Sequence, residues 1–260
     1  MFEHKGVDCL YPKNIIEKLN EIAPVELAEG FDCGKIGLIV EGTREPVRIA
    51  TALDATKKVV CEAVGRDIDL LIVHHTPIWH PITSVTGSHA ELLREVLTSG
   101  MHVFVMHTNY DNAPKGVNAC LCDLLSLSDC VPMSGGIVGT VSLSLAEIQS
   151  RLNAPLLVHN AHICRGSNSS LNFDCSCDVN ELRLGVVGGS GFDPALIDQA
   201  RSLGAAAFLS AELKHSVMRQ YPDMVLLEST HYALEAPSMR ILAHNHGWIY
   251  IDDAPSVALV

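Results

Sequence analysis

Apolar positions in the first half of the chain follow two periods, which predict alternating helices and strands. Helical spacing of apolar residues predicts an amphipathic helix over residues 12–23. Short apolar runs predict strands at residues 36–40, 47–53, 70–73 and 101–107, and helices are predicted at residues 55–65, 89–99 and 117–125. This succession is typical of an α/β layered domain.

The second half resumes the alternation after a glycine-rich stretch. Three glycines and a proline in residues 132–139 indicate a boundary between an N-terminal α/β domain, residues 1–131, and a C-terminal one, residues 132–260. Asp193 is expected to cap a helix that ends at Leu203. The other expected strands are 137–143, 156–158, 184–187, 205–209, 224–227 and 248–251, with helices at 145–152, 212–219 and 232–244 and a loop at 165–177.

Two histidines stand at the end of a predicted buried strand. His74 and His75 follow the apolar run Leu70–Val73, and Pro77 prevents a regular continuation. Because adjacent strand residues point to opposite faces, the two rings can converge only where the strand ends and the chain turns. A solvated strand end is the other interpretation of this pair.

Two further predicted strands end in comparable residues. His107 and Asp111 follow one of them, and His231 and Glu235 follow another. Ligands of open α/β sheets bind outside the carboxyl ends of the strands. Because His231 and Glu235 are four residues apart at a helix start, they are expected on one helical face, about 6 Å from each other.

These strand-end residues mix imidazole and carboxylate, which suits Zn, Fe, Mn, Co or Ni better than Ca or Mg. The candidate ligands are His74, His75, Asp111, His231 and Glu235. Two ions about 3.5 to 4 Å apart with a bridging carboxylate would use all of them. His107 and Glu212, which shares a predicted helical face with His215, are candidates for proton transfer. A chain with 13 histidines also brings some of them close together by chance, but the positions at strand ends favour a metal site.

Composition limits the kinds of partner and the cellular location that we expect for this protein. A net charge of −12 over 260 residues, without a basic stripe, argues against a nucleic-acid partner. Because we find no signal-peptide core and no apolar run of about 18 to 20 residues, we expect a cytoplasmic protein without a membrane span. The nine cysteines are expected to be mostly free thiols, with Cys120 and Cys122 in core packing. Cys175 and Cys177 form a CxC pair, a weak signal for a metal.

The turn Gly188-Gly-Ser-Gly191 lies between a predicted strand and a predicted helix. Such a turn can cradle phosphate through its backbone N–H groups and the helix N-terminus. It matches neither the Walker pattern nor G-x-G-x-x-G. A plain tight turn is the alternative interpretation, and the sequence favours it somewhat.

These motifs together resemble the dimetal family of GTP cyclohydrolase type 2 homologues, also called the NIF-three-like family. The segments that carry the resemblance are His74-His75-Thr-Pro77, His107-Thr-Asn-Tyr-Asp111 with Gly116 and Asn118, His231-Tyr-Ala-Leu-Glu235, Leu209–His215 and the glycine turn. It covers nearly the whole chain and is weakest from about residue 140 to 180. Phe31-Asp-Cys-Gly-Lys-Ile-Gly37-Leu38 stands where the family carries Trp-Asp-Asn-Val-Gly-Leu, and His-His-Thr-Pro replaces His-His-Pro. Both changes affect expected substrate contacts rather than ligands.

The resemblance implies two interlinked α/β layered domains with a dinuclear metal site between them. It implies the candidate ligands above, with His107 close by, two divalent transition-metal ions per chain and a homohexamer. The expected function is a metal-dependent hydrolase of a nucleotide or related heterocycle, such as GTP. The alternative is a metal-binding regulatory or carrier protein without catalysis. A substrate pocket beside the metals would discriminate the two, with Trp79, Tyr110 and Lys115 as candidate lining residues.

Overall fold

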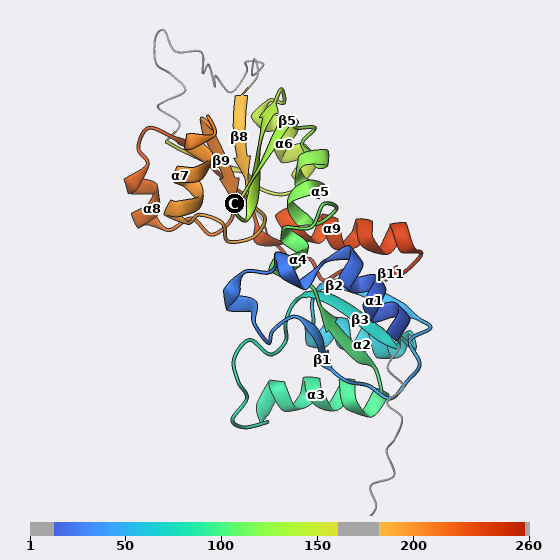
Figure 1. Cartoon of the computed structure of the whole chain (residues 1–260). Coiled ribbons are helices and arrows are strands. Elements are labelled where there is room, and N and C mark those ends of the chain that lie inside the picture. The colour runs from blue at the N-terminus through green and yellow to red at the C-terminus, as the bar shows by residue number, and fades with distance from the viewer. Residues whose placement is uncertain (1–12, 161–181, 258–260) are drawn as a thin grey trace, which may run out of the picture. The chain divides into compact units, whose positions relative to one another are not determined.

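A computed structural model describes residues 13–160 and 182–257, and the chain divides into two compact units. Unit 1 consists of Met1–His107 and Leu242–Asp253, and unit 2 consists of Thr108–Ile241 and Ala254–Val260. Each unit contains one β-sheet with helices packed against it (Figure 1). The predicted α/β class with two layered sheets is therefore confirmed.

The sheet of unit 1 has β3 at its centre, in the strand order β1-β4-β3-β2-β11. Its strands are β1 (Gly37–Val40), β2 (Ile49–Asp54), β3 (Leu70–His75), β4 (His102–Val105) and β11 (Ile249–Tyr250). The strands β2, β3 and β4 are parallel neighbours, whereas β1 pairs antiparallel with β4. The carboxyl ends of three neighbouring strands therefore meet at one edge of the sheet.

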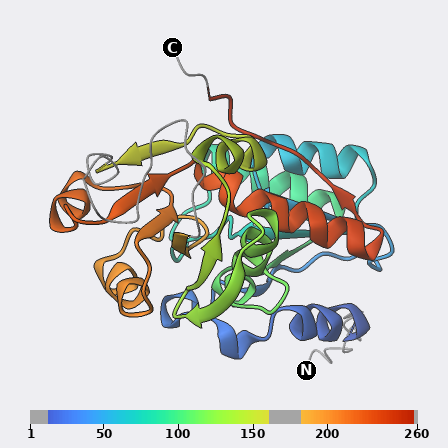
Figure 2. The same cartoon turned by 90° about the horizontal axis from the view of Figure 1, so that it is seen from above.

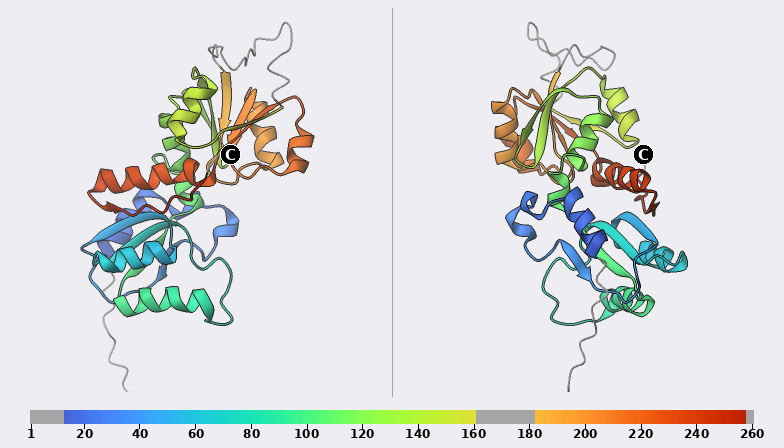
Figure 3. Two further views of the ribbon diagram at one scale, coloured as in Figure 1. Left: turned by 180° about the vertical axis from the view of Figure 1, so that it is seen from behind. Right: turned by 45° about the vertical axis from the view of Figure 1, so that its right-hand side comes forward.

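The helices of unit 1 lie close to their predicted positions. They are α1 (Lys13–Ile22), α2 (Lys57–Gly65) and α3 (Gly87–Ser99), with the 3₁₀ turns η1 (Val25–Leu27) and η2 (Gly30–Asp32). Helices α2 and α3 pack against each other (Figure 3) and contribute to a core that includes Val60, Leu71 and Val103. Thr56 caps the start of α2 through its side chain, and Gly100 ends α3 with a φ of +74° that suits glycine.

Unit 2 contains a mixed six-stranded sheet in the order β5-β6-β8-β9-β10-β7. Its strands are β5 (Ser128–Met133), β6 (Gly136–Val141), β7 (Leu157–His159), β8 (Leu182–Val186), β9 (Ala207–Ser210) and β10 (Val225–Glu228). The strands β8, β9 and β10 are parallel neighbours, and the other pairs are antiparallel. Residues 132–139 lie in the β5–β6 hairpin, which is inside unit 2. The limits 1–131 and 132–260 stay a prediction about folding units.

Helices cover both faces of the unit 2 sheet (Figure 3). They are α4 (Thr108–Asp111), α5 (Val117–Leu124), α6 (Leu145–Leu152), α7 (Pro194–Ser202) and α8 (His215–Gln220), followed by the long helix α9 (His231–His246; Figure 2). On one face, α5, α6 and α9 bury Leu121, Ile148 and Leu234. On the other face, α7 and α8 bury Ile197 and Val217. This two-sided burial explains why β8, β9 and β10 are predominantly apolar.

The predicted helix at residues 212–219 is wrong at its start. Helix α8 begins at His215, and Glu212 precedes it with a φ of +62°. A positive φ is incompatible with a right-handed helix, so Glu212 and His215 do not share a helical face. Spacing alone could not reveal this backbone conformation.

The burial of two cysteines agrees with the sequence. Cys120 and Cys122 are 8% and 7% exposed, which confirms their core packing. Burial raises the pKa of Cys120 to about 11 and that of Cys122 to about 12, so both thiols stay protonated at neutral pH. Cys175 and Cys177 lie outside the described residues. Among the helices of residues 13–160 and 182–257, none is long and apolar enough to cross a membrane.

Candidate metal centre

The two histidines of β3 are held by the strands on either side of it. His74 is fully buried, and its Nδ1 lies 2.8 Å from the carbonyl oxygen of Met106, just after β4. The Nδ1 of His75 lies 2.7 Å from Oδ1 of Asp54, the last residue of β2 and the register partner of His75. The two ring centroids are only 4.9 Å apart. The rings therefore converge at the end of the strand.

His107 adds a third imidazole to unit 1. One nitrogen from each of His74, His75 and His107 lies within 4.8 Å of the others. The Nδ1 of His107 lies 2.9 and 2.8 Å from the two carboxylate oxygens of Asp32, which is fully buried. This contact fixes the orientation of the His107 ring and directs Nε2 away from Asp32.

In unit 2 the imidazole of His231 lies between two carboxylates. Its Nδ1 is 2.6 Å from Oε1 of Glu212, and its Nε2 is 2.9 Å from Oε2 of Glu235. Glu235 is 3% exposed, and one of its carboxylate oxygens lies within 4.8 Å of one from Asp111. The spacing of four residues in α9 thus brings His231 and Glu235 together, as predicted.

The glycine turn packs directly against this pair. Gly189 has a φ of +61°, and a Cβ atom there would overlap Oε1 of Glu235 and lie 3.0 Å from Nε2 of His231. Glycine avoids both the backbone strain and the clash. Gly189 therefore leaves the space that the Glu235 carboxylate occupies.

Hydrogen bonds within unit 2 use two N–H groups of the turn, those of Gly188 and Gly191. Gly188 donates to Oδ1 of Asn118 at 2.9 Å, and Gly191 donates to Oγ of Ser210 at 2.7 Å. The Nδ2 of Asn118 donates to the carbonyl oxygen of Asp111 at 3.0 Å, so Asn118 joins Asp111 to the turn. These bonds favour the tight-turn interpretation over the phosphate cradle.

The donor set fits a divalent transition-metal ion. Four histidines have an oxygen acceptor beside Nδ1: His74, His75, His107 and His231. A proton on Nδ1 that is donated to this acceptor leaves the lone pair on Nε2, which is the form that ligates metals. Imidazole and carboxylate ligands together favour transition metals over Mg or Ca.

Sequence reasoning missed the carboxylates that hold two of these rings. Asp54 follows the same strand-end rule that identified His75, so that signal could have found it. Asp32 lies in η2, and its only sequence signal was its place in the Phe31–Leu38 segment that the family resemblance singled out.

The three candidate lining residues have different surroundings. Tyr110 is 1% exposed, and its hydroxyl donates to the carbonyl oxygen of Ser238 at 3.3 Å, so it belongs to the core of unit 2. Burial raises the pKa of Tyr110 well above its usual range. Lys115 is exposed, whereas Trp79 packs against His107 with ring centroids 5.3 Å apart.

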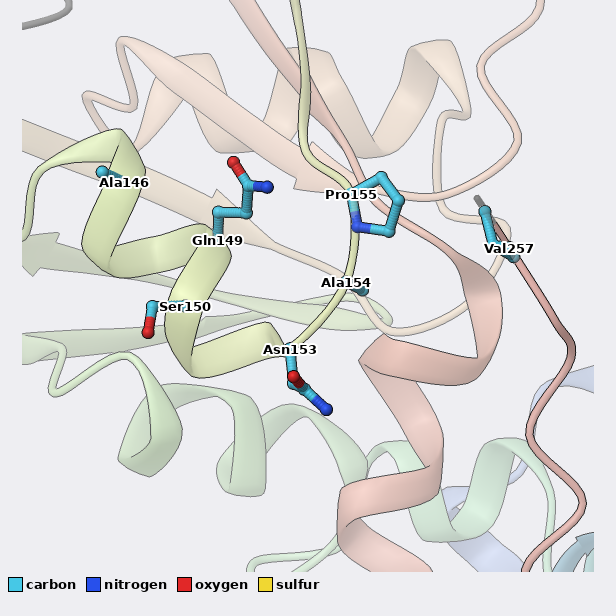
Figure 4. A pocket seen from close by; sticks show the side chains of 7 residues that line it. All are labelled: Ala146, Gln149, Ser150, Asn153, Ala154, Pro155 and Val257. Atoms are coloured by element: carbon cyan, nitrogen blue, oxygen red, sulfur yellow. The ribbon is translucent and has the colours of Figure 1, made fainter. Parts of the chain in front are cut away.

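A shallow pocket of about 500 Å³ lies beside α6 in unit 2 (Figure 4). Its lining includes Gln149, Ser150, Asn153, Pro155 and Val257. None of its lining residues carries a carboxylate, an imidazole or a thiol. The pocket therefore does not supply the metal chemistry that the strand ends offer.

The two sheets and their strand-end donors define an α/β protein with groups of side chains that could hold a metal ion. The model of the family described as Duf34/NIF3 (NGG1p interacting factor 3) matches residues 11–246. The chain belongs to this family, which confirms the resemblance seen in the sequence.

Relatives agree with this membership, and a solved structure shares the fold. The "GTP cyclohydrolase 1 type 2 homolog" of Streptomyces coelicolor is 29% identical over 252 residues, covering 90% of this chain and 87% of that protein. The protein of the same name from Clostridium perfringens is 27% identical and covers 86% of each chain. Reduced HcgD from Methanocaldococcus jannaschii has a TM-score of 0.75 at 24% identity and covers 92% of this chain and 95% of its own. The structural match shows a shared fold.

Proposed function

We propose that this chain binds two divalent transition-metal ions and hydrolyses a nucleotide or a related heterocycle. The proposed ligands are His74, His75, Asp111, His231 and Glu235. The observation that carries the proposal is the oxygen acceptor beside Nδ1 of each of the three ligand histidines and of His107, which orients Nε2 for a metal. The name of the relatives, GTP cyclohydrolase 1 type 2 homolog, supports a nucleotide as the substrate.

The protein's own part in the reaction is to orient ligands and to move protons. Bound metal ions would stabilise developing negative charge and lower the pKa of a bound water to about 7. His107, held by the buried carboxylate of Asp32, is our first candidate to accept and return a proton, at Nε2. Glu212 is our second candidate, and its carboxylate also orients His231.

Metal analysis and hydrolysis assays on the same preparation test this function. Protein purified without chelator and then reconstituted is analysed for its elements and assayed against a panel of nucleotides and phosphoesters, with and without added metal. We expect close to two ions per chain and hydrolysis that depends on them. Absence of metal after reconstitution would contradict the metal function. Two ions without hydrolysis would favour the regulatory or carrier alternative.

The matched control for metal binding is a histidine–carboxylate pair outside the proposed ligands. The Nε2 of His159 lies 2.9 Å from Oε2 of Glu228 in unit 2. We expect His75→Ala to lose metal and His159→Ala to keep it. Equal losses would mean that histidine–carboxylate pairing alone does not mark the site.

We also propose that the chain forms a homohexamer, on the strength of the family resemblance. A chain with a net charge of −12 repels its copies, so raising the ionic strength should favour assembly. Light scattering over a salt series measures this. A monomer at every salt and protein concentration would contradict the hexamer.

A further inference from the structure

Two aromatic rings are exposed beside His107 in unit 1. Trp79 is 40% exposed and Phe31 is 56% exposed. Their ring centroids lie 5.3 and 6.2 Å from that of His107, and both rings meet the imidazole edge to face, at 88° and 71°. Large aromatic side chains that stay this accessible next to a candidate proton-transfer group offer π-faces to a ligand.

Lys35 places a cation beside the same two rings. Its Nζ lies 4.4 Å from the centroid of Trp79 and 5.7 Å from that of Phe31, which are cation–π distances. Within residues 13–160 and 182–257, no carboxylate pairs with this ammonium, although the chain has 30 acidic and 18 basic residues. The charge of Lys35 is thus available to an anion.

We propose that Phe31, Lys35 and Trp79 form a subsite for a planar heteroaromatic ligand that carries an anionic group. The aromatic faces stack on the ring, and the Lys35 ammonium pairs with the anion. The proposal rests on the proposed function, because the subsite adjoins His107. In this proposal, Phe31, Lys35 and Trp79 select the substrate of that function. A purely apolar docking surface would not require a cation beside the rings.

The fluorescence of Trp79 reports on this subsite. The chain has two tryptophans, and the other, Trp248, stacks on His246 with centroids 4.6 Å apart. Trp248→Phe therefore leaves Trp79 as the single emitter. In this background, we expect guanosine 5′-monophosphate to quench the emission of chelator-treated protein and guanosine to bind about 10-fold more weakly.

Substitutions at the subsite separate the contribution of the charge from that of the rings. Lys35→Met keeps the aliphatic stem and should weaken the nucleotide about 10-fold while leaving guanosine unchanged. Phe31→Ala should weaken both ligands at least about 5-fold. The control Lys57→Met removes a lysine of the same unit that pairs with Glu91, and should change neither affinity.

Two results would overturn the subsite: no nucleotide binding, or equal nucleotide affinity in the Lys35→Met and Lys57→Met variants. Elemental analysis of the same proteins is independent of the fluorescence. If only the subsite proposal is wrong, reconstituted protein still contains metal. Failure of the metal function alone leaves nucleotide binding by chelator-treated protein intact, so the two failures can be distinguished.

Discussion

Units 1 and 2 place their candidate ligands by the same sheet geometry but hold them in different ways. In unit 1, His74 and His75 belong to the strand itself. Hydrogen bonds to Asp54, at the end of β2, and to Met106, just after β4, orient their rings. In unit 2, the ligands His231 and Glu235 stand on the helix after β10. The glycine turn and Glu212, which follow β8 and β9, contact these two ligands: Gly189 lies against Glu235, and Glu212 pairs with His231.

This difference predicts what each unit tolerates. Acceptors beside Nδ1 orient the rings in unit 1, so removing an acceptor should disturb them most. The carboxylate of Glu235 in unit 2 depends on the space that Gly189 leaves, so added volume should disturb it most. The two units should therefore respond to different kinds of substitution.

The largest effect is expected from removing a ligand rather than a neighbouring proton-transfer group. Glu235→Ala should lose at least one of the two proposed ions, because a buried carboxylate ligand disappears. His107→Ala should lower metal affinity only about 10- to 100-fold, as is typical of groups beside a metal site. Elemental analysis after dialysis against metal buffers measures both. Equal retention in the two variants would count against the ligand assignment, and His159→Ala should match the wild-type protein.

The next effect tests the dependence of unit 1 on hydrogen-bond acceptors. Asp54→Ala removes the acceptor from Nδ1 of His75 and should weaken metal binding about 10- to 100-fold. Glu91→Ala, which removes a surface carboxylate paired with Lys57 in the same unit, is the control. Competition with a coloured chelator gives the affinities. Unchanged affinity in Asp54→Ala would mean that this hydrogen bond is not needed to orient His75.

The strand ends could be predicted from sequence because they depend on local patterns. The apolar run of β3 and the four-residue spacing in α9 are visible without knowing any neighbour. The contact between Asp54 and His75 depends on β2 lying beside β3, and the order of strands in a sheet is not a local property. Strand β5 was missed because most of its side chains are exposed and because it contains Pro132, a residue type that is rare inside strands.

The next smaller effect tests the dependence of unit 2 on space. In Gly189→Ala, the new methyl group would meet the end of the Glu235 side chain, which must move away from its position. We expect metal affinity to fall about 10-fold or more, as for other disturbances next to a metal ligand. Gly204→Ala is the matched control, since Gly204 has a φ of +87° and nothing within 4 Å of the added atom. Gly204→Ala therefore introduces only backbone strain, about 1 to 2 kcal/mol, and no clash. Equal metal affinity in the two variants would show that the clash does not matter.

The smallest effect concerns the helix cap that follows Asp54. Oγ1 of Thr56 accepts a hydrogen bond from the N–H of Val59 and donates one to Oδ2 of Asp253 at 2.6 Å. Thr56→Ala should lower the free energy of unfolding by about 1 kcal/mol through the lost cap. Asp193→Ala, at the cap of α7 in unit 2, should cost a similar amount, because it also removes one backbone contact. Urea denaturation measures both.

The stability that Thr56 contributes to unit 1 should depend on pH, because Thr56 also binds the carboxylate of Asp253. The hydrogen bond from Thr56 and then the ammonium of Lys58 hold the pKa of Asp253 below its usual 3.8. A carboxyl group whose pKa is lowered in the folded state stabilises that state fully above pH 3.8. This stabilisation is lost as the pH falls through the lower pKa of the folded state. The loss of unfolding free energy in Thr56→Ala should therefore be larger at neutral pH than well below pH 3.8. The loss that remains at low pH is that of the cap to the N–H of Val59. Thr56→Ser keeps the hydroxyl and should restore the wild-type profile. A pH-independent loss in Thr56→Ala would show that the bond to Asp253 adds nothing to the stability of unit 1.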